Sequence, residues 1–268
     1  MRFLLGITTY NRLEYLKKCV ASWNQTRNKE HHWTLVIADD GSNDGTRDYL
    51  HDLDRDGNPE IWTMSYERRG VHYQKNMLLE FAERSHIDFA FMCEDDMVFL
   101  HPGWDDLYYS VAMETKFHHL VFFDPIWNEK YREGGGYKHP VCYNGLCCQV
   151  KNKCIFGCFW TFTKKVIEEV GYFDLDKFGL CGHGHIDYSW RCARAGFNTM
   201  ENVYDAMGSE GYLTIQGGEN YQDSIPSEQR EAMAYLEQRL ADKENTLRED
   251  RIYIPWNESR FNMNGEQI

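Results

Sequence analysis

The stretch Phe91-Met92-Cys93-Glu94-Asp95-Asp96-Met97-Val98-Phe99 places three acidic residues inside an apolar run. The apolar residues predict a buried strand over residues 89–93, and burying carboxylates is costly unless something compensates. A divalent cation is the usual compensation, because hard cations bind carboxylate oxygens. The other interpretation is a turn whose acids face water, which the return of apolar residues at Met97 disfavours. The sequence therefore predicts a cation site at the C-terminal end of a strand, where open α/β sheets bind ligands.

The residues around this stretch alternate between strand and helix patterns. Apolar runs predict strands, and apolar positions spaced three and four apart predict helices. The expected strands cover residues 3–8, 34–38, 61–66 and 89–93, and the expected helices lie at about residues 13–23, 46–53 and 77–82. Such alternation is typical of βαβ units, so we expect an α/β fold with a mostly parallel sheet flanked by helices.

Beyond residue 100 the pattern is less regular. Further helices are expected near residues 104–111, 166–170, 186–195 and 226–240, and further strands at residues 120–123 and 155–161. A long stretch without a clear pattern covers residues 124–153, where Asn144-Gly145 favours a small hairpin.

Composition narrows the class of protein. The chain has 268 residues and a formal net charge of −13, which argues against a broad nucleic-acid-binding face and leaves only a local basic groove open. No run approaches 18 consecutive apolar residues, and the apolar N-terminal run is too short for a signal peptide. We therefore expect no membrane span and a cytoplasmic location.

Cysteine is frequent, with nine residues, five of them between Cys142 and Cys158. None of these five spacings is the close pair typical of a zinc ribbon. Reduced thiols are the favoured interpretation, and a structural zinc or disulfides stay open.

Two more polar segments follow predicted strands. Thr8-Thr9-Tyr10-Asn11-Arg12 follows the first strand, and Asp39-Asp40-Gly41-Ser42-Asn43-Asp44-Gly45-Thr46 follows the second. A polar loop with an aromatic residue at the edge of a sheet suits a planar base. Alternatively, both segments are turns that cap the helices after them.

The order and spacing of these three segments resemble the nucleotide-sugar glycosyltransferases of the GT-A fold, most closely family 2, over roughly residues 3–196. The resemblance implies a Rossmann-like GT-A domain over residues 1–210, followed by a loop and helical extension over residues 211–268 that packs on it. It also implies a metal-dependent transfer of a sugar from a nucleotide diphosphate donor, a UDP-sugar above all, to an acceptor hydroxyl.

The resemblance assigns roles to individual residues. Glu94-Asp95-Asp96 matches the acidic DXD-like motif, in which Asp96 binds Mn²⁺ or Mg²⁺, Glu94 supports the metal site and Asp95 meets the ribose. The cation would act as a Lewis acid while the nucleotide diphosphate departs. The residues expected to bind the nucleotide-sugar are Thr8, Tyr10, Arg12, Asp39, Lys75 and Asp95. For Lys75 and its neighbours a solvated charge cluster is the alternative.

The segment Cys181-Gly182-His183-Gly184-His185-Ile186-Asp187-Tyr188-Ser189-Trp190-Arg191 departs from the family pattern. When Arg191 is aligned, the expected acidic pair falls on Gly184 and His185. Asp187 is the favoured general base for an inverting transfer, and His185 is the alternative, because a histidine titrates near working pH. His183 or His185 could instead bind a metal.

Other functions stay open as well. Without a base the chain would be a retaining glycosyltransferase, or an inactive protein that binds a nucleotide or a glycan. A sugar-nucleotide pyrophosphorylase is disfavoured, because the segment after the first strand lacks a glycine-rich motif. Residues 207–212 and 216–218 could form a lid over the donor. Aromatic candidates for stacking on sugars are Trp104, Trp127, Tyr137 and Trp160.

Overall fold

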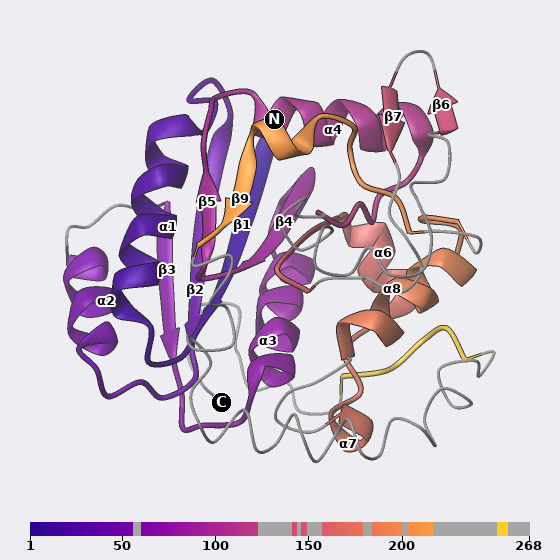
Figure 1. Cartoon of the computed structure of the whole chain (residues 1–268). Coiled ribbons are helices and arrows are strands. Elements are labelled where there is room, and N and C mark those ends of the chain that lie inside the picture. The colour runs from indigo at the N-terminus through magenta and orange to yellow at the C-terminus, as the bar shows by residue number, and fades with distance from the viewer. Residues whose placement is uncertain are drawn as a thin grey trace, which may run out of the picture.

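A computed structural model describes residues 1–55, 60–122, 141–143, 146–148, 157–178, 184–199, 203–216 and 251–256. Its centre is a five-stranded sheet with the order β3-β2-β1-β4-β8, shown in Figure 1. The strands are β1 (Arg2–Thr9), β2 (His32–Asp39), β3 (Ile61–Ser65), β4 (Phe89–Glu94) and β8 (Phe159–Phe162). The first four are parallel and β8 is antiparallel. The expected α/β fold with a mostly parallel sheet is confirmed.

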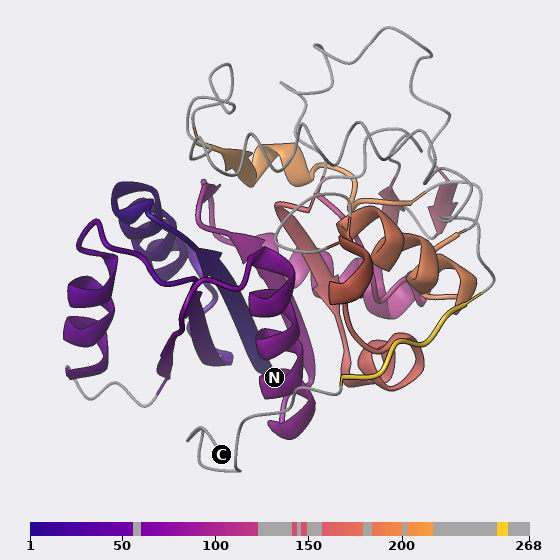
Figure 2. The same cartoon turned by 90° about the horizontal axis from the view of Figure 1, so that it is seen from below.

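Helices cover both faces of the sheet (Figures 1 and 2). Side chains of α1, α2 and α4 pack with one set of alternate strand residues, and those of α3, α6 and α8 pack with the other. Because both faces are buried, the strands are nearly continuous apolar runs, which is why the sequence predicted them well. The helices are α1 (Leu13–Thr26), α2 (Thr46–Arg55), α3 (Val71–Arg84), α4 (Trp104–Thr115), α6 (Lys164–Val170), α7 (Leu175–Phe178) and α8 (Gly184–Arg194).

The topology places the three polar segments at one edge of the sheet. β1 lies between β2 and β4, so the order of the strands reverses there. Thr9 is in register with Asp39, and Thr8 with Glu94. The carboxyl ends of all three strands therefore meet at a topological switch point, which is where open α/β sheets bind ligands.

After Glu94 the chain turns at Asp95 and Asp96 and enters a second, two-stranded sheet. Its strands β5 (Met97–Phe99) and β9 (Leu213–Ile215) pair antiparallel. The sequence did not predict this pair, because three residues carry too little of a pattern. β9 falls in residues 211–268, the predicted extension, and brings part of it beside the acidic motif. The division at residue 210 stays a prediction.

Two local predictions need revision. Residues 120–122 do not form the expected strand, and a single antiparallel bridge joins Val121 to Trp160. The reason is local, since the hydroxyl of Thr161 accepts the hydrogen bond of the Leu120 N–H at 2.9 Å. The described part of the expected strand at residues 155–161 begins at Phe159. The expected hairpin is present as β6 (Val141–Tyr143) paired with β7 (Leu146–Cys148).

Residues 251–256 form an extended segment, here called the strap, that crosses α6 and α3. The Ile254 N–H donates to the Val170 carbonyl at 3.1 Å, and the Ile254 carbonyl accepts from Tyr172 at 3.0 Å. At the end of the strap the Trp256 indole donates to Glu80 of α3 at 2.8 Å. The predicted helix near residues 226–240 lies outside the described residues. Within the parts of the chain given above, every helix is too short or too polar to cross a membrane.

Candidate functional site

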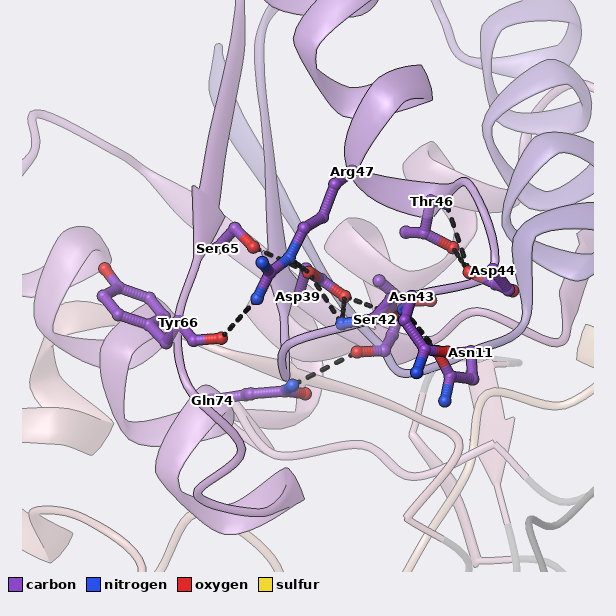
Figure 3. A network of polar contacts seen from close by, with 11 residues as sticks. Asn11, Asp39, Ser42, Asn43, Asp44, Thr46, Arg47, Ser65, Tyr66 and Gln74 are labelled. Carbon is purple, nitrogen blue, oxygen red and sulfur yellow. Dashed lines mark hydrogen bonds and ion pairs between the residues drawn. The ribbon is translucent and has the colours of Figure 1, made fainter.

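Asp39 ends β2 as a buried carboxylate surrounded by donors (Figure 3). It accepts hydrogen bonds from the backbone N–H of Ser42 at 3.1 Å and from the Ser65 hydroxyl at 2.7 Å. The Ser42 hydroxyl also donates to it, and Arg47 lies 3.6 Å away. Asp39 therefore holds the turn after β2, as the turn interpretation expects. Its role in reading a base stays a prediction.

The same turn fixes the starts of two helices. Asp44 accepts from the Leu13 N–H at 2.9 Å at the beginning of α1 and from the Thr46 N–H at 3.1 Å at the beginning of α2. Asn11 links the two loops, since its N–H donates to Ser42 and its side-chain oxygen accepts from Asn43. Figure 3 shows the contact of Asp44 with Thr46 and those of Asn11 with Ser42 and Asn43. Asx contacts of this kind satisfy donors that a helix leaves open.

Arg12 joins the first polar segment to the acidic motif. Its guanidinium lies 3.1 Å from Asp95 Oδ1 and 3.0 Å from Asp96 Oδ2. Asp95 also accepts from the Thr9 hydroxyl at 2.7 Å. Both carboxylates are almost fully buried. The structure thus brings Arg12, Asp95 and Asp96 together, and their roles toward a donor and a cation stay predictions.

Lys75 of α3 forms an ion pair with Glu94, the remaining acid of the motif. Its ammonium lies 2.8 Å from Glu94 Oε1 and donates to the Gly157 carbonyl at 3.1 Å. The side chain of Lys75 is 2% exposed and that of Glu94 is 21% exposed. Lys75 is therefore a buried ion-pair partner and not part of a solvated charge cluster.

Burial and neighbouring charges shift the pKa values of the three acids in different directions. Burial raises the pKa of Asp95 to about 7 and also raises the pKa of Asp96, against the opposing charge of Arg12. Burial acts on Glu94 in the same sense, but the ammonium of Lys75 outweighs it and lowers the pKa of Glu94. Asp95 and Asp96 share one guanidinium in these contacts, an arrangement that a further cation would stabilise.

One oxygen of the acidic motif, Asp96 Oδ1, is buried without a hydrogen-bond partner among the described residues. Because buried polar atoms are nearly always satisfied, such an oxygen calls for a missing donor or ion, and a hard cation fits a carboxylate oxygen. No three His, Cys, Asp or Glu side chains of the described residues gather into a metal cluster.

Gln216 is a residue near this site that the sequence did not single out as a ligand. Its N–H donates to the Asp96 carbonyl at 2.7 Å, and its side-chain amide donates to the Tyr15 carbonyl at 3.0 Å. The sequence placed Gln216 in a possible lid, because its contact with Asp96 depends on a strand pairing across more than a hundred residues.

His185 lies in the first turn of α8 against the bend that leads into β8. A Cβ atom on Gly157 would lie 2.9 Å from the His185 ring, so the imidazole packs directly on the backbone there. Gly157 is the residue whose carbonyl binds Lys75. The charge of His185 is also among the causes that lower the pKa of Glu94, after those of Lys75. His185 is therefore a neighbour of the acidic motif.

Asp187, which also lies on α8, forms an ion pair with Arg191. Its carboxylate accepts from Arg191 Nε at 2.7 Å, and the Arg191 side chain is 1% exposed. The same guanidinium donates to the carbonyls of Val170, Tyr172 and, in the strap, Ile252. Asp187 and Arg191 together anchor the strap.

The other predicted residues are placed as follows. Thr8 is buried, and Tyr10 is half-buried with the guanidinium of Arg68 4.7 Å from its ring centroid. Trp104 and Trp160 belong to the core and do not line an open surface. Trp127, Tyr137, His183 and Gly217-Gly218 lie outside the described residues. Four of the nine cysteines are buried free thiols, namely Cys19, Cys93, Cys158 and Cys192. For the other five, reduced thiols stay a prediction.

Comparison with known proteins agrees with this geometry. Residues 5–105 match the model of the family described as glycosyl transferase family 2. An uncharacterized glycosyltransferase of Acanthamoeba polyphaga mimivirus is 26% identical over 222 residues, which are 79% of this chain and 80% of the relative.

Solved structures share the fold. The mannosyltransferase PcManGT from Pyrobaculum calidifontis, in complex with GDP-Man and Mn²⁺, aligns with a TM-score of 0.54 and 13% identity over 72% of this chain and 52% of its own. GalNAc-T7 with UDP, GalNAc and Mn²⁺ aligns with a TM-score of 0.55 and 11% identity over 77% of this chain and 42% of its own. The chain thus spans about half the length of these structures. These matches confirm the resemblance: the chain has a GT-A fold, and residues 5–105 are similar to glycosyl transferase family 2.

Proposed function

We propose that the chain transfers a sugar from a nucleotide diphosphate donor, with UDP as the first candidate, to an acceptor hydroxyl in a cation-dependent reaction. The observation that carries this proposal is the acidic turn at the switch point, where one buried oxygen of Asp96 has no hydrogen-bond partner among the described residues. Asp96 would hold the cation with support from Glu94, and the cation would neutralise charge on the departing diphosphate.

The residues of the chain prepare this site before any ligand arrives. Arg12 fixes Asp95 and Asp96 in one orientation, and Lys75 fixes Glu94. Such preorganisation lowers the cost of ordering the site on binding. Tyr10 and Arg68 contact each other at the same edge, where a base could stack, and Asp39 ends the neighbouring strand β2.

The direct test is release of nucleoside diphosphate from UDP-, GDP-, CDP- and dTDP-sugars, with and without Mn²⁺. We expect one nucleotide to be released in a Mn²⁺-dependent manner and release to be lost in Asp96→Asn. If the wild-type chain binds a nucleotide but cleaves no donor in the presence of any acceptor tested, it is a binding protein and the proposal fails.

For the proton acceptor we favour His185 over the predicted Asp187. Residues two apart on a helix point about 200° apart, so the two side chains face different surroundings. His185 packs on Gly157, whose carbonyl binds Lys75, and its charge acts on Glu94, whereas Asp187 binds the guanidinium that holds the strap.

This assignment is tested by comparing His185→Gln with Asp187→Asn. We expect His185→Gln to lower the transfer rate by about 10²–10⁴-fold, the usual contribution of a general base, with little change in unfolding temperature. Asp187→Asn should mainly lower the unfolding temperature. A normal rate in His185→Gln together with a lost rate in a fully folded Asp187→Asn would restore Asp187 as the base.

A further inference from the structure

We infer that Gln216 is a second oxygen ligand of the cation site at Asp96. The inference rests on the proposed function, since it concerns the same cation. It adds a ligand from the C-terminal part of the chain, on a segment that neither the acidic motif nor the matched residues 5–105 include.

The strand register sets the two side chains next to each other. β5 and β9 pair with Met97 opposite Ile215, so Asp96 lies opposite Gln216 at the end of the ladder, where the Gln216 N–H donates to the Asp96 carbonyl at 2.7 Å. Residues directly opposite in an antiparallel pair extend from the same face with Cβ atoms about 4.5–5.5 Å apart.

Both side chains carry a buried oxygen without a partner. Among the residues that the structure describes, three buried side-chain oxygens have no hydrogen-bond partner, and they are Asp96 Oδ1, Gln216 Oε1 and the Tyr188 hydroxyl. Two of the three thus belong to one cross-strand pair. Since orphaned buried acceptors are rare, two adjacent ones indicate one missing group that serves both.

The rest of each side chain is already fixed. The Gln216 amide nitrogen donates to the Tyr15 carbonyl, and turning the amide over would set two oxygens against each other. Asp96 Oδ2 accepts from Arg12, whose guanidinium lies 4.6 Å from the ring centroid of Tyr15. Both side chains are thus held by contacts that involve Tyr15 or Arg12. Asp96 Oδ1 and Gln216 Oε1 are the two oxygens that these contacts leave without a partner among the described residues.

A divalent cation fits these two oxygens better than a neutral donor. Carboxylate and amide oxygens are the ligands that Mg²⁺ and Mn²⁺ take in proteins. Asp95 and Asp96 share the single guanidinium of Arg12, so a cation at Asp96 Oδ1 would add positive charge where two buried carboxylates have one partner.

The test measures Mn²⁺ affinity of the full chain by electron paramagnetic resonance of free Mn²⁺, with and without UDP. The variants are Gln216→Met, which keeps the volume and removes the oxygen, and Gln216→Glu, which keeps an oxygen and loses the contact with Tyr15. Thr214→Val is the matched control, because Thr214 lies two residues before Gln216 and so on the same face of β9. Thermal unfolding of each variant checks the fold.

We expect Gln216→Met to weaken Mn²⁺ binding by about tenfold or more, the loss typical of residues that support a metal. Gln216→Glu should bind Mn²⁺ at least as tightly as the wild type, and Thr214→Val should be unchanged. Unchanged affinity in Gln216→Met, or equal losses in Gln216→Met and Thr214→Val, would overturn the inference.

The two proposals fail in different ways. If the wild type binds Mn²⁺ and Asp96→Asn abolishes binding while Gln216→Met does not, Gln216 is not a ligand and the proposed function stands. If the wild type binds no Mn²⁺ with or without UDP, the cation-dependent reaction and the role of Gln216 are both wrong.

Discussion

Arg12 is the residue that connects the most parts of the candidate site. It follows β1, contacts Asp95 and Asp96 after β4, and lies over the ring of Tyr15 in α1. A guanidinium suits this position because its planar donors reach two carboxylates at once. Arg12 therefore keeps two buried acids in place and leaves one oxygen of Asp96 for a ligand.

The pair between Lys75 and Glu94 predicts a stability change at the residue scale. Lys75→Met removes the donor of both Glu94 and the Gly157 carbonyl. Breaking a buried pair costs about 3–5 kcal/mol, and we expect the lower end because Glu94 is partly exposed. Urea unfolding measures the loss, and adding Glu94→Gln should recover most of it.

A matched control comes from α6. Lys165 and Glu169 form an exposed pair at 3.6 Å, and such pairs contribute about 0–1 kcal/mol. Lys165→Met should therefore leave the unfolding free energy nearly unchanged. Equal losses of unfolding free energy in the two lysine variants would show that the Lys75–Glu94 pair stabilises the fold no more than an exposed pair does.

His119 predicts a pH dependence of stability. Burial lowers the pKa of His119 to about 3, with Arg191 adding to the effect, from the ordinary value of 6.5. The unfolded chain therefore takes up a proton below pH 6.5 that the folded chain does not, so stability falls as pH falls toward 3. Between pH 6.5 and 5 the loss from this group is about 2 kcal/mol.

Urea unfolding at pH 5 and pH 7 measures this loss. In His119→Gln the difference between the two pH values should shrink by about that amount, whereas His101→Gln, at an exposed position, should leave it unchanged. A pH difference that is the same in His119→Gln and the wild type would contradict the assignment.

At the scale of elements, the strap depends on Gly171. This residue has φ +73°, and a Cβ atom there would lie 2.0 Å from the Ile254 carbonyl oxygen. Gly196 also has positive φ, at +85°, but a Cβ atom there would meet nothing within 4 Å. Both substitutions by alanine strain the backbone by about 1 kcal/mol, and only Gly171→Ala also displaces the strap.

We therefore expect Gly171→Ala to destabilise the chain more than Gly196→Ala. Proteolysis within residues 251–256 should become faster in Gly171→Ala, and urea unfolding gives the difference in stability. Equal stability and equal proteolysis in both variants would mean that the strap is not held at Gly171.

The length and burial of each element decide how well the sequence could predict it. β1, β2 and β4 are buried on both faces, so their apolar runs and polar ends could be read directly. β5 and β9 have three residues each, and their pairing joins residues far apart in the chain. Gln216 was missed for that reason, and the orientation of Asp187 and His185 on α8 depended on contacts with Arg191 and Gly157 that no local pattern encodes.

At the scale of the whole molecule, charge is distributed unevenly. The chain has a net charge of −13, which repels an anionic donor at long range. Arg12, Arg47, Arg68 and Lys75 nevertheless make their contacts around the carboxyl edge of the sheet. Local attraction at this edge, together with a cation at Asp96, would offset the repulsion.

The most direct test of the account is thermal unfolding with UDP, GDP, CDP and dTDP, each with and without Mn²⁺, for the wild type and Asp96→Asn. A nucleotide at 100 times its dissociation constant adds about 2.7 kcal/mol of stability, which is a shift of a few degrees at this chain length. We expect a Mn²⁺-dependent shift with one nucleotide that Asp96→Asn abolishes. No shift with any nucleotide, or an equal shift in Asp96→Asn, would contradict it.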